Sequence, residues 1–357
     1  MTRPRGGTPA RAVRLGIVGC GRATSTLHLP ALAAVPAIDV AALADTDAQA
    51  LSRAAALRPS ARTAAGYRSL VDDPALDAIA ICVPTAAHAE IALAAIDAGK
   101  HVFVEKPLAL SLDDARRIVA AASATGVRAM VGFNTRWHAQ ARRAREAIAG
   151  GAIGALDAIA SRLTSFHTGV PDWQCGRATG GGVLFELAVH HVDLWRFLTG
   201  AEVEEVVACT RSGEREDESA VLVARLSGGA LATALFAERT SRSNEVEVFG
   251  RAASISLSLY RFDGYSTSDA ASVAGDGRAR LRAAGAFVRA LPGALRDARA
   301  GGAWRMTYAD EWRHFAAAIR EGAPVASTLA DGVRALAVVL AAVESASSGR
   351  SVRVSPR

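Results

Sequence analysis

An acid, a histidine and a second acid follow one another along the segment GGGVLFELAVHHVDLWRFLTG. In an α-helix Glu186, His190 and Asp193 would stand at positions i, i+4 and i+7, forming one polar stripe on an otherwise apolar helix. A carboxylate one turn before a histidine can orient the imidazole and raise its basicity, as a general acid/base near neutral pH requires. We therefore expect His190 to transfer a proton with Glu186 orienting it. His191 points about 100° away and is expected to be structural.

Two other interpretations of this stripe remain open. Glu186, His190 and Asp193 could ligate a metal ion, but the sequence has no second histidine cluster to support such a site, and we expect no bound metal. The three side chains could also form a purely structural buried network. The cysteines are far apart and include no CxxC pair, which disfavours a zinc site or a disulfide framework: Cys20, Cys82, Cys175 and Cys209.

Lysine is rare in this chain. Lys100 and Lys106 are the only lysines, and arginine fills every other place among the 41 basic residues. A lysine therefore indicates a position where arginine's rigid fork and permanent charge would not serve. Lys106 stands between Glu105 and Pro107 at the end of a strand-like run, which would place it at the edge where a parallel sheet binds its ligands. A surface ion pair at a turn is equally compatible with these residue types.

A glycine turn follows the first strand-like run, RLGIVG, and opens a helix. Gly19 and Gly21 would let the backbone turn sharply and approach a pyrophosphate, which the helix N-terminus holds through its free N–H groups. Thr24 occupies the third position of the GxGxxG fingerprint, so the literal motif fails, although Ala23 is small enough for close packing. We expect Gly19, Gly21, Arg22, Ala23 and Thr24 to contact a dinucleotide.

Asp45 ends the second strand-like run, VAALAD, where a carboxylate can bond both ribose hydroxyls and would repel a 2′-phosphate. This placement favours NAD, although Arg22 or Arg53 could accommodate the phosphate of NADP, which is not excluded. Further cofactor contacts are expected where later strands end, since open parallel sheets bind ligands at that edge. They are Pro84, Thr85, His88, Glu105 and Lys106.

The first part of the chain alternates β-rich apolar runs with helical patterns. Strands are predicted over residues 15–18, 40–44, 78–83, 101–104 and 129–133. Helices are predicted over 27–35, 48–57, 87–98 and 112–124. Strands that are apolar on both faces and alternate with helices indicate a parallel sheet covered by helices. We expect a loose tail over residues 1–13 and a doubly wound Rossmann domain over 14–134.

After a helix over 139–149 the apolar pattern changes to period two. Strands are predicted over 158–166, 203–209, 220–226, 230–238, 244–249 and 254–259, and helices over 183–198, 308–321 and 329–347. Ser227-Gly228-Gly229 and Gly250-Arg251 indicate tight hairpin turns. We expect an α+β domain over 135–357, with an open, mostly antiparallel sheet. Residues 275–302 are expected to form a solvated excursion in which Pro292 breaks any helix; the alternative is a basic lid over an anionic substrate.

Composition narrows the class of protein. The chain has 357 residues, of which 50% are hydrophobic and 21% charged, which suits two domains and excludes a disordered chain. Its longest apolar run, residues 335–343, is too short for a membrane span, and no signal peptide precedes the first strand, so we expect a soluble cytoplasmic protein. The net charge of +6 is spread along the chain without a recognition helix, which argues against nucleic-acid binding.

Together and in this order, these motifs resemble the family of glucose–fructose oxidoreductase, inositol dehydrogenase and MocA. The resemblance covers nearly the whole chain: GIVGCGRATSTLHLPAL, ADTD, ICVPTAAHAEIALAAIDAGKHVFVEKPLALS, GFNTRWH, GGGVLFELAVHHVDLWRFLTG and STLADGVRALAVVLAAVESASSGRSVRV. It implies an NAD(P)-dependent oxidoreductase that transfers a hydride between the nicotinamide and a carbinol carbon of a sugar, sugar derivative or cyclitol. It also implies a homodimer or homotetramer formed through the C-terminal sheet, with the last helices packed back on the first domain.

By this resemblance Lys106 matches the family lysine at the reacting hydroxyl, and His190 matches the acid/base histidine. Glu186 stands where the family usually has Asp, and its extra methylene moves the carboxylate about 1 to 1.5 Å outward. Two alternatives stay open: a member that retains NAD and cleaves or epimerises a sugar by transient oxidation, and a non-catalytic nucleotide-binding sugar sensor. The expected substrate-side residues are Asn134, Arg136, His138, Trp173 and Asp193.

Overall fold

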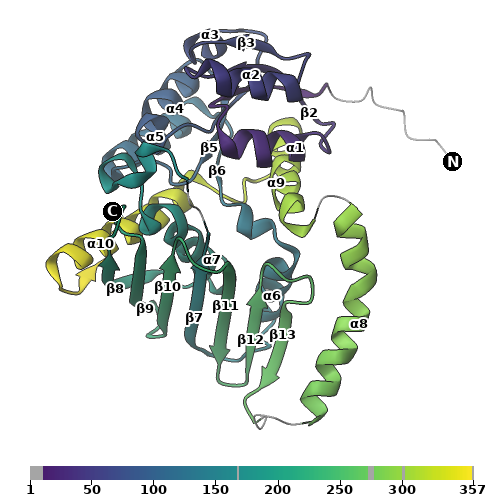
Figure 1. Cartoon of the computed structure of the whole chain (residues 1–357), viewed down its shortest axis with the longest axis vertical. Coiled ribbons are helices and arrows are strands. Elements are labelled where there is room, and N and C mark those ends of the chain that lie inside the picture. The colour runs from purple at the N-terminus through teal and green to yellow at the C-terminus, as the bar shows by residue number, and fades with distance from the viewer. Residues whose placement is uncertain (1–10, 167–168, 272–276, 300–301, 356–357) are drawn as a thin grey trace.

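Two β-sheets organise the chain in the computed structural model, which describes residues 11–166, 169–271, 277–299 and 302–355 (Figure 1). The first sheet has six strands in the order β3-β2-β1-β4-β5-β6, and the second has eight in the order β13-β12-β11-β7-β10-β9-β8-β14. The expected loose tail lies outside the described residues as far as residue 10, and Val13 already begins β1.

Every pairing within the first sheet is parallel, as the apolar runs predicted. The central strands are buried on both faces, which is why their sequences are continuously apolar. The short edge strand β3 was not predicted, because its three residues are largely exposed and show no apolar pattern. The strands are β1 (Val13–Val18), β2 (Ile38–Ala44), β3 (Arg62–Ala64), β4 (Ala78–Ile81), β5 (His101–Glu105) and β6 (Ala129–Gly132).

Helices cover both faces of this sheet, and the sheet separates two hydrophobic clusters. The helix after β1 begins with a π-helical turn, Thr24–His28, and continues as the short α1 (Leu29–Leu32). Asp47 caps α2 by accepting the backbone N–H groups of residues 49 and 50, as an Asp at this position should. The other helices of this part are α2 (Ala48–Leu57), α3 (Arg68–Val71), α4 (His88–Asp97) and α5 (Leu112–Thr125).

The second sheet is antiparallel except for the parallel pairing of β7 with β10. Both predicted hairpin turns are confirmed, because residues 227–230 join β9 to β10 and residues 251–252 join β11 to β12. Alternation along β9 buries Ala220, Leu222 and Ala224 and leaves the other face open. The strands are β7 (Leu156–Thr164), β8 (Val203–Arg211), β9 (Ser219–Leu226), β10 (Leu231–Ala237), β11 (Ser243–Gly250), β12 (Ala253–Ser258), β13 (Tyr265–Asp269) and β14 (Val352–Arg353).

The remaining helices connect the two sheets. Helices α6 (Ala139–Ala149) and α7 (Val189–Thr199) pack against each other and against the second sheet, and α7 is preceded by another π-helical turn, Leu184–Ala188. Near the end of the chain α9 (Ala303–Arg320) contacts α1, and α10 (Leu329–Ser348) contacts α5, α7 and β8. The last helices therefore pack against both parts of the chain (Figure 1). Within the described ranges, no helix combines the length and the apolar character that crossing a membrane requires.

The prediction that Pro292 breaks any helix is wrong. Residues Gly277–Arg299 form one continuous helix, α8, which contains Pro292 and stands at the side of the molecule (Figure 1). Proline removes one N–H from the helix and costs about 3 kcal/mol in an interior turn. Here Pro292 and Val288, whose carbonyl loses its partner, are both exposed, so water can hydrate that carbonyl. Phe287 anchors α8 to Phe262 in the β12–β13 turn, with ring centroids 5.3 Å apart.

Candidate active site

The glycine turn and Asp45 meet at the carboxyl edge of the first sheet. Gly19 has φ +94°, and a Cβ there would stand 2.3 Å from the carbonyl oxygen of Cys82, so the position requires glycine. The backbone N–H of Cys20 donates to Asp45 Oδ2 at 2.6 Å, and that of Asp47 donates to Oδ1 at 2.8 Å. The Asp45 carboxylate is thereby fixed beside the turn, as the motif predicted.

Thr24 explains why the turn survives without the third glycine. Its side chain is fully buried and its Oγ1 donates to the carbonyl of Gly19 at 2.6 Å, so the threonine ties the helix to the turn. The space next to Gly21 is open, since a Cβ at this position would meet no atom within 4 Å. Gly21, Arg22 and Ala23 are exposed at the start of the helix, where N–H groups can hold a pyrophosphate. The turn therefore fits a dinucleotide.

Lys106 follows the last residue of β5 and lies next to the helix that carries the acid and the histidine. Its Nζ donates to the backbone carbonyl and to Oε2 of Glu186, each at 3.2 Å. The side chains of Lys106 and Glu186 are only 12% and 16% exposed, so the pair is largely removed from solvent. Residues 80 positions apart in the sequence are thus brought together.

His190 is neutral at physiological pH. Burial lowers its pKa well below the ordinary value, and the positive charge of Lys106 and the neighbouring His191 lower it further. Its Nδ1 is buried without a hydrogen-bond partner among the described residues. A neutral imidazole can accept a proton from a hydroxyl, and the charge of Lys106 acts on this ring.

The expectation that Glu186 orients His190 is not met by a hydrogen bond between the two side chains. Glu186 binds Lys106 instead, and no hydrogen bond joins it to His190. Residues Leu184–Ala188 form a π-helical turn, so the α-helical i, i+4 spacing assumed from the sequence does not hold here. The structural role predicted for His191 is confirmed: it is fully buried, and its Nε2 lies 3.0 Å from Oδ1 of Asn244.

A buried chain of hydrogen bonds holds Glu105, the residue before Lys106, and the sequence did not predict it. Trp312 Nε1 donates to His28 Nδ1 at 3.2 Å, and His28 Nε2 lies 2.9 Å from Oε1 of Glu105. Because Nδ1 accepts the indole proton, Nε2 must carry the ring proton and donate it to Glu105. Burial tends to raise the pKa of Glu105, but the hydrogen bond from His28 and the charge of Lys106 hold it below the ordinary value. No local motif signals a contact across 284 residues.

His88 and Thr85 support the crevice. His88 is buried. Its Nδ1 lies 2.8 Å from the carbonyl of Pro107 and its Nε2 3.0 Å from that of Val83, so the ring links the segments that follow β5 and β4. Thr85 is buried against Gly180, where a Cβ would stand 2.9 Å from the Thr85 Cβ. Pro84 is exposed at the same edge.

Arg136 and Asp193, expected on the substrate side, bind each other. Arg136 Nε donates to Asp193 Oδ2 at 2.7 Å, and Arg136 also donates to Asp331 at 3.1 Å. Asp193 has no exposed surface, so it belongs to a buried ion-pair network that ties α7 to α10. Glu186, His190 and Asp193 therefore do not converge, and the described residues contain no cluster of three potential metal ligands.

The other expected substrate residues differ in exposure. Asn134 is 1% exposed and donates to Oγ1 of Thr307 at 3.2 Å, and His138 is 2% exposed and accepts the N–H of Gln140 at the start of α6. This burial argues against direct substrate contacts for both. Trp173 is half-buried in a 3₁₀ turn, Asp172–Cys175, and its role stays a prediction.

Glu311 on α9 is a fully buried acid whose two oxygens lack hydrogen-bond partners among the described residues. Burial raises the pKa of Glu311 well above its ordinary value, and the charge of Glu105 adds to the shift. The unfolded chain releases this proton at lower pH than the folded protein, so stability falls as pH rises above the ordinary pKa of about 4.3.

We expect Glu311→Gln to stabilise the protein near pH 8 by about 1.4 kcal/mol or more, the equivalent of one pKa unit. The gain should vanish near pH 4, where Glu311 is protonated in both states. Thermal unfolding at the two pH values measures it, with the exposed Glu321→Gln at the end of the same helix as the control. Equal stabilisation at both pH values would contradict the assigned ionisation.

Comparisons with known proteins agree with this arrangement. A model of an oxidoreductase family with an NAD-binding Rossmann fold, Gfo/Idh/MocA, matches residues 13–133, and the model of that family's C-terminal alpha/beta domain matches residues 145–354. The uncharacterized oxidoreductase YrbE of Bacillus subtilis is 34% identical over 54% of this chain and 55% of its own length. The myo-inositol 2-dehydrogenase of Thermotoga maritima is 28% identical over 96% of this chain and 98% of its own.

One solved structure shows the same architecture with a bound cofactor. GenD2 from gentamicin A biosynthesis, in complex with NAD, is 25% identical, with a TM-score of 0.80 over 99% of this chain and 100% of that chain. The predicted fold class and the predicted NAD-binding domain are confirmed.

Proposed function

Because the chain belongs to the Gfo/Idh/MocA oxidoreductase family, we propose that it transfers a hydride between NAD and a carbinol carbon of a sugar, sugar derivative or cyclitol. The observation that carries this proposal is the position of Lys106, whose Nζ donates to Glu186 at 3.2 Å on the continuous helical segment that also carries His190. The relation to a myo-inositol 2-dehydrogenase over 96% of the chain supports a polyhydroxylated substrate.

The cofactor and the protein side chains perform different parts of the reaction. NAD, when bound, supplies the nicotinamide that accepts or returns the hydride. Neutral His190 accepts the hydroxyl proton as the carbinol is oxidised, and returns it in the reverse direction. The Lys106 ammonium donates a hydrogen bond to the oxygen on which negative charge develops. Glu186 holds Nζ of Lys106 in place through its carbonyl and its carboxylate.

Asp45 supports a preference for NAD over NADP. Its carboxylate is fixed by two backbone N–H groups beside the glycine turn, so a 2′-phosphate on the adenosine ribose would meet a fixed negative charge.

We also propose that copies of the chain associate through the open face of the second sheet. Large apolar side chains are 40–50% exposed there, which is typical of an interaction surface. They belong to three adjacent strands and include Val207, Val221, Val223, Leu231 and Leu235.

A turnover assay of purified protein tests the function. With NAD and a panel of sugars and cyclitols that includes myo-inositol, we expect absorbance at 340 nm to rise for at least one substrate. His190→Asn should lower kcat for that substrate by about 100-fold or more, while NADH binding, followed by fluorescence, stays unchanged. A His190→Asn protein with wild-type kcat would overturn the assignment of the base. Failure of the wild-type protein to bind NADH would overturn the proposed function.

A further inference from the structure

Helix α8 carries nearly all of the excess positive charge of the protein. The chain has 41 basic and 35 acidic residues, a net charge of +6. Residues Gly277–Arg299 contain six of the arginines and one aspartate, which leaves the rest of the chain close to neutral. Basic residues are spread along the sequence, but outside α8 acidic residues balance them in number. With 23 residues, α8 is about 35 Å long, and it stands at the side of the molecule (Figure 1).

An apolar stripe runs along α8 and is open to solvent. Leu281, Val288 and Leu295 recur every seven residues, which places them along one line of the helix. Their exposed fractions are 75%, 63% and 61%. Ala284 and Leu291 follow the first two by three positions, widen the stripe, and are exposed as well. A row of exposed large apolar side chains is typical of an interaction surface.

A row of arginines runs beside this stripe. Arg289 and Arg296 each follow a stripe residue by one position, so they lie about 100° around the helix from it. Both are exposed, and neither forms an ion pair with any residue that the structure describes. No acid stands three or four positions away from either arginine, where a helical partner would have to be.

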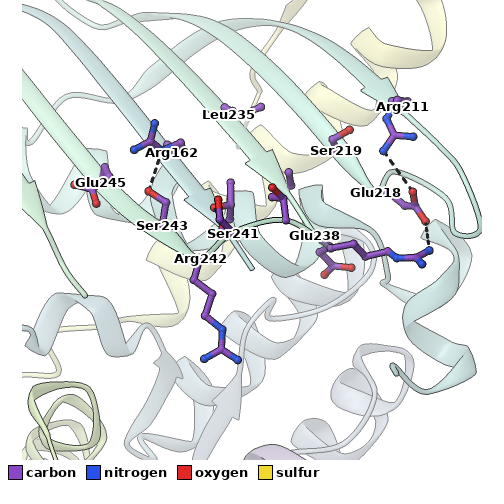
Figure 2. Close-up of a pocket in the computed structure, with 14 residues that line it drawn as sticks. Arg162, Arg211, Glu218, Ser219, Leu235, Glu238, Ser241, Arg242, Ser243 and Glu245 are labelled. Atoms are coloured by element: carbon purple, nitrogen blue, oxygen red, sulfur yellow. Dashed lines mark hydrogen bonds and ion pairs between the residues drawn. The ribbon is translucent and has the colours of Figure 1, made fainter. Parts of the chain in front are cut away.

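Arginines elsewhere on the surface have acidic partners. In the pocket around the loop of residues 238–242, Glu218 lies 3.5 Å from both Arg211 and Arg239, and Figure 2 shows the pair that it forms with Arg211. On α5, Arg116 and Arg117 pair at 3.0 Å with acids three positions before them. The arginines of α8 therefore differ from these in being left to an anionic partner outside the protein.

The protein holds α8 by another side of the helix. Phe287 packs on Phe262 with ring centroids 5.3 Å apart, and α8 also contacts α9. Phe287 precedes Val288 by one position, so it lies about 100° from the stripe, on the side away from the arginine row. The stripe and the arginines can therefore both meet a partner while α8 stays attached to the protein.

We propose that α8 docks the protein on the surface of an anionic lipid bilayer. A helix with a row of large apolar residues beside a row of arginines has the pattern of helices that lie in the interface of a bilayer, with the apolar side buried at the level of the headgroups. Leu281, Val288 and Leu295 insert among the lipids, and the arginines contact the headgroup phosphates. The helix lies on the bilayer and does not cross it, because its arginines exclude it from the hydrocarbon core.

A second copy of the chain fits this helix less well. Two α8 helices that paired along their stripes would bring together two sets of six arginines, with one aspartate in each to offset them. Like charges at such distances repel each other, whereas an anionic bilayer attracts both copies. This inference goes beyond the proposed hydride transfer and does not depend on it.

Vesicle flotation of the full chain tests the proposal with two probes. One is vesicles of phosphatidylcholine alone, and the other is vesicles of phosphatidylcholine and phosphatidylglycerol in equal amounts. We expect the protein to bind the anionic vesicles at least about tenfold more tightly at low salt, because each arginine held near an anionic surface strengthens binding about fivefold. Higher ionic strength should weaken this binding, since salt screens the attraction.

Replacing the three most exposed residues of the stripe tests its insertion. The triple variant Leu281→Gln, Val288→Gln and Leu295→Gln keeps every arginine, and we expect it to bind anionic vesicles at least about tenfold more weakly than the wild type. Leu57→Gln, which removes a leucine that is 46% exposed on α2, should bind like the wild type. All these side chains are exposed, so the Tm should stay unchanged.

Replacing the arginine row tests the charge. The double variant Arg289→Gln and Arg296→Gln should bind anionic vesicles more weakly and with a smaller dependence on salt. Arg251→Gln with Arg350→Gln removes the same charge from two exposed positions outside α8 and should retain wild-type binding.

Three results would overturn the proposal. The first is failure of the wild-type protein to bind anionic vesicles, which would leave an acidic protein as the partner of α8. The second is undiminished vesicle binding by the stripe variant. The third is a smaller oligomer of the stripe variant in light scattering without vesicles, which would make the stripe an interface between copies. None of these results bears on hydride transfer, which the turnover assay tests separately.

Discussion

We expect the replacement of Lys106 by methionine to lower kcat by about 100- to 1,000-fold, with little change in the Kd for NADH. Methionine keeps the length and apolar stem of lysine but loses the ammonium, which acts on charge that develops only in the transition state. The Nζ of Lys106 is held 3.2 Å from two oxygens of Glu186, so the lost group is a positioned donor. Steady-state turnover of the identified substrate and fluorescence titration with NADH measure the two quantities.

Two further lysine variants sharpen this prediction. Lys106→Arg keeps the positive charge but presents a rigid fork in place of a compact ammonium, and we expect it to lose at least about tenfold in kcat. Lys100→Met is the contrast, because Nζ of Lys100 donates to backbone carbonyls of Asp73 and Leu76 at 2.6 and 2.9 Å. It should lower the Tm without changing kcat of the folded protein. A fully active Lys106→Met would contradict the mechanism.

We expect the replacement of Gly19 by alanine to abolish measurable NADH binding and also to lower the Tm. The new Cβ would stand 2.3 Å from the carbonyl oxygen of Cys82, and φ +94° disfavours any residue with a side chain. The turn must therefore shift, and the N–H groups it aims at the pyrophosphate shift with it. Fluorescence titration with NADH and thermal unfolding measure the two effects.

Alanine variants at two other glycines distinguish an effect on NADH binding from an effect on thermal stability. Gly21→Ala meets no protein atom within 4 Å, so it should leave the Tm unchanged while it blocks the approach of a pyrophosphate. Gly293→Ala, exposed in α8 and equally free of contacts, should change neither property adversely. NADH binding by Gly21→Ala with wild-type affinity would mean that the pyrophosphate does not lie over this turn.

Local chemistry made much of the fold predictable. The alternation of apolar runs with helical patterns indicated the parallel sheet, and glycine turns at Ser227–Gly229 and Gly250–Arg251 indicated two hairpins that the structure contains. The strands that were missed are β3, β13 and β14, which are short or largely exposed at sheet edges. Edge pairing of this kind comes from the neighbouring strand, and leaves no apolar period in the sequence itself.

The sequence by itself determined which groups are available: the glycine turn with Asp45, a lysine where arginine is the rule, and a histidine on a helix that begins in glycines. Only the tertiary structure decided their partners. Glu186 lies in a π-helical turn and binds Lys106 instead of His190. Asp193 pairs with Arg136, which is 57 residues away in the sequence. The physical reason is that turns and caps depend on neighbours along the chain, whereas buried polar groups take whichever partner the packed fold brings within hydrogen-bonding distance.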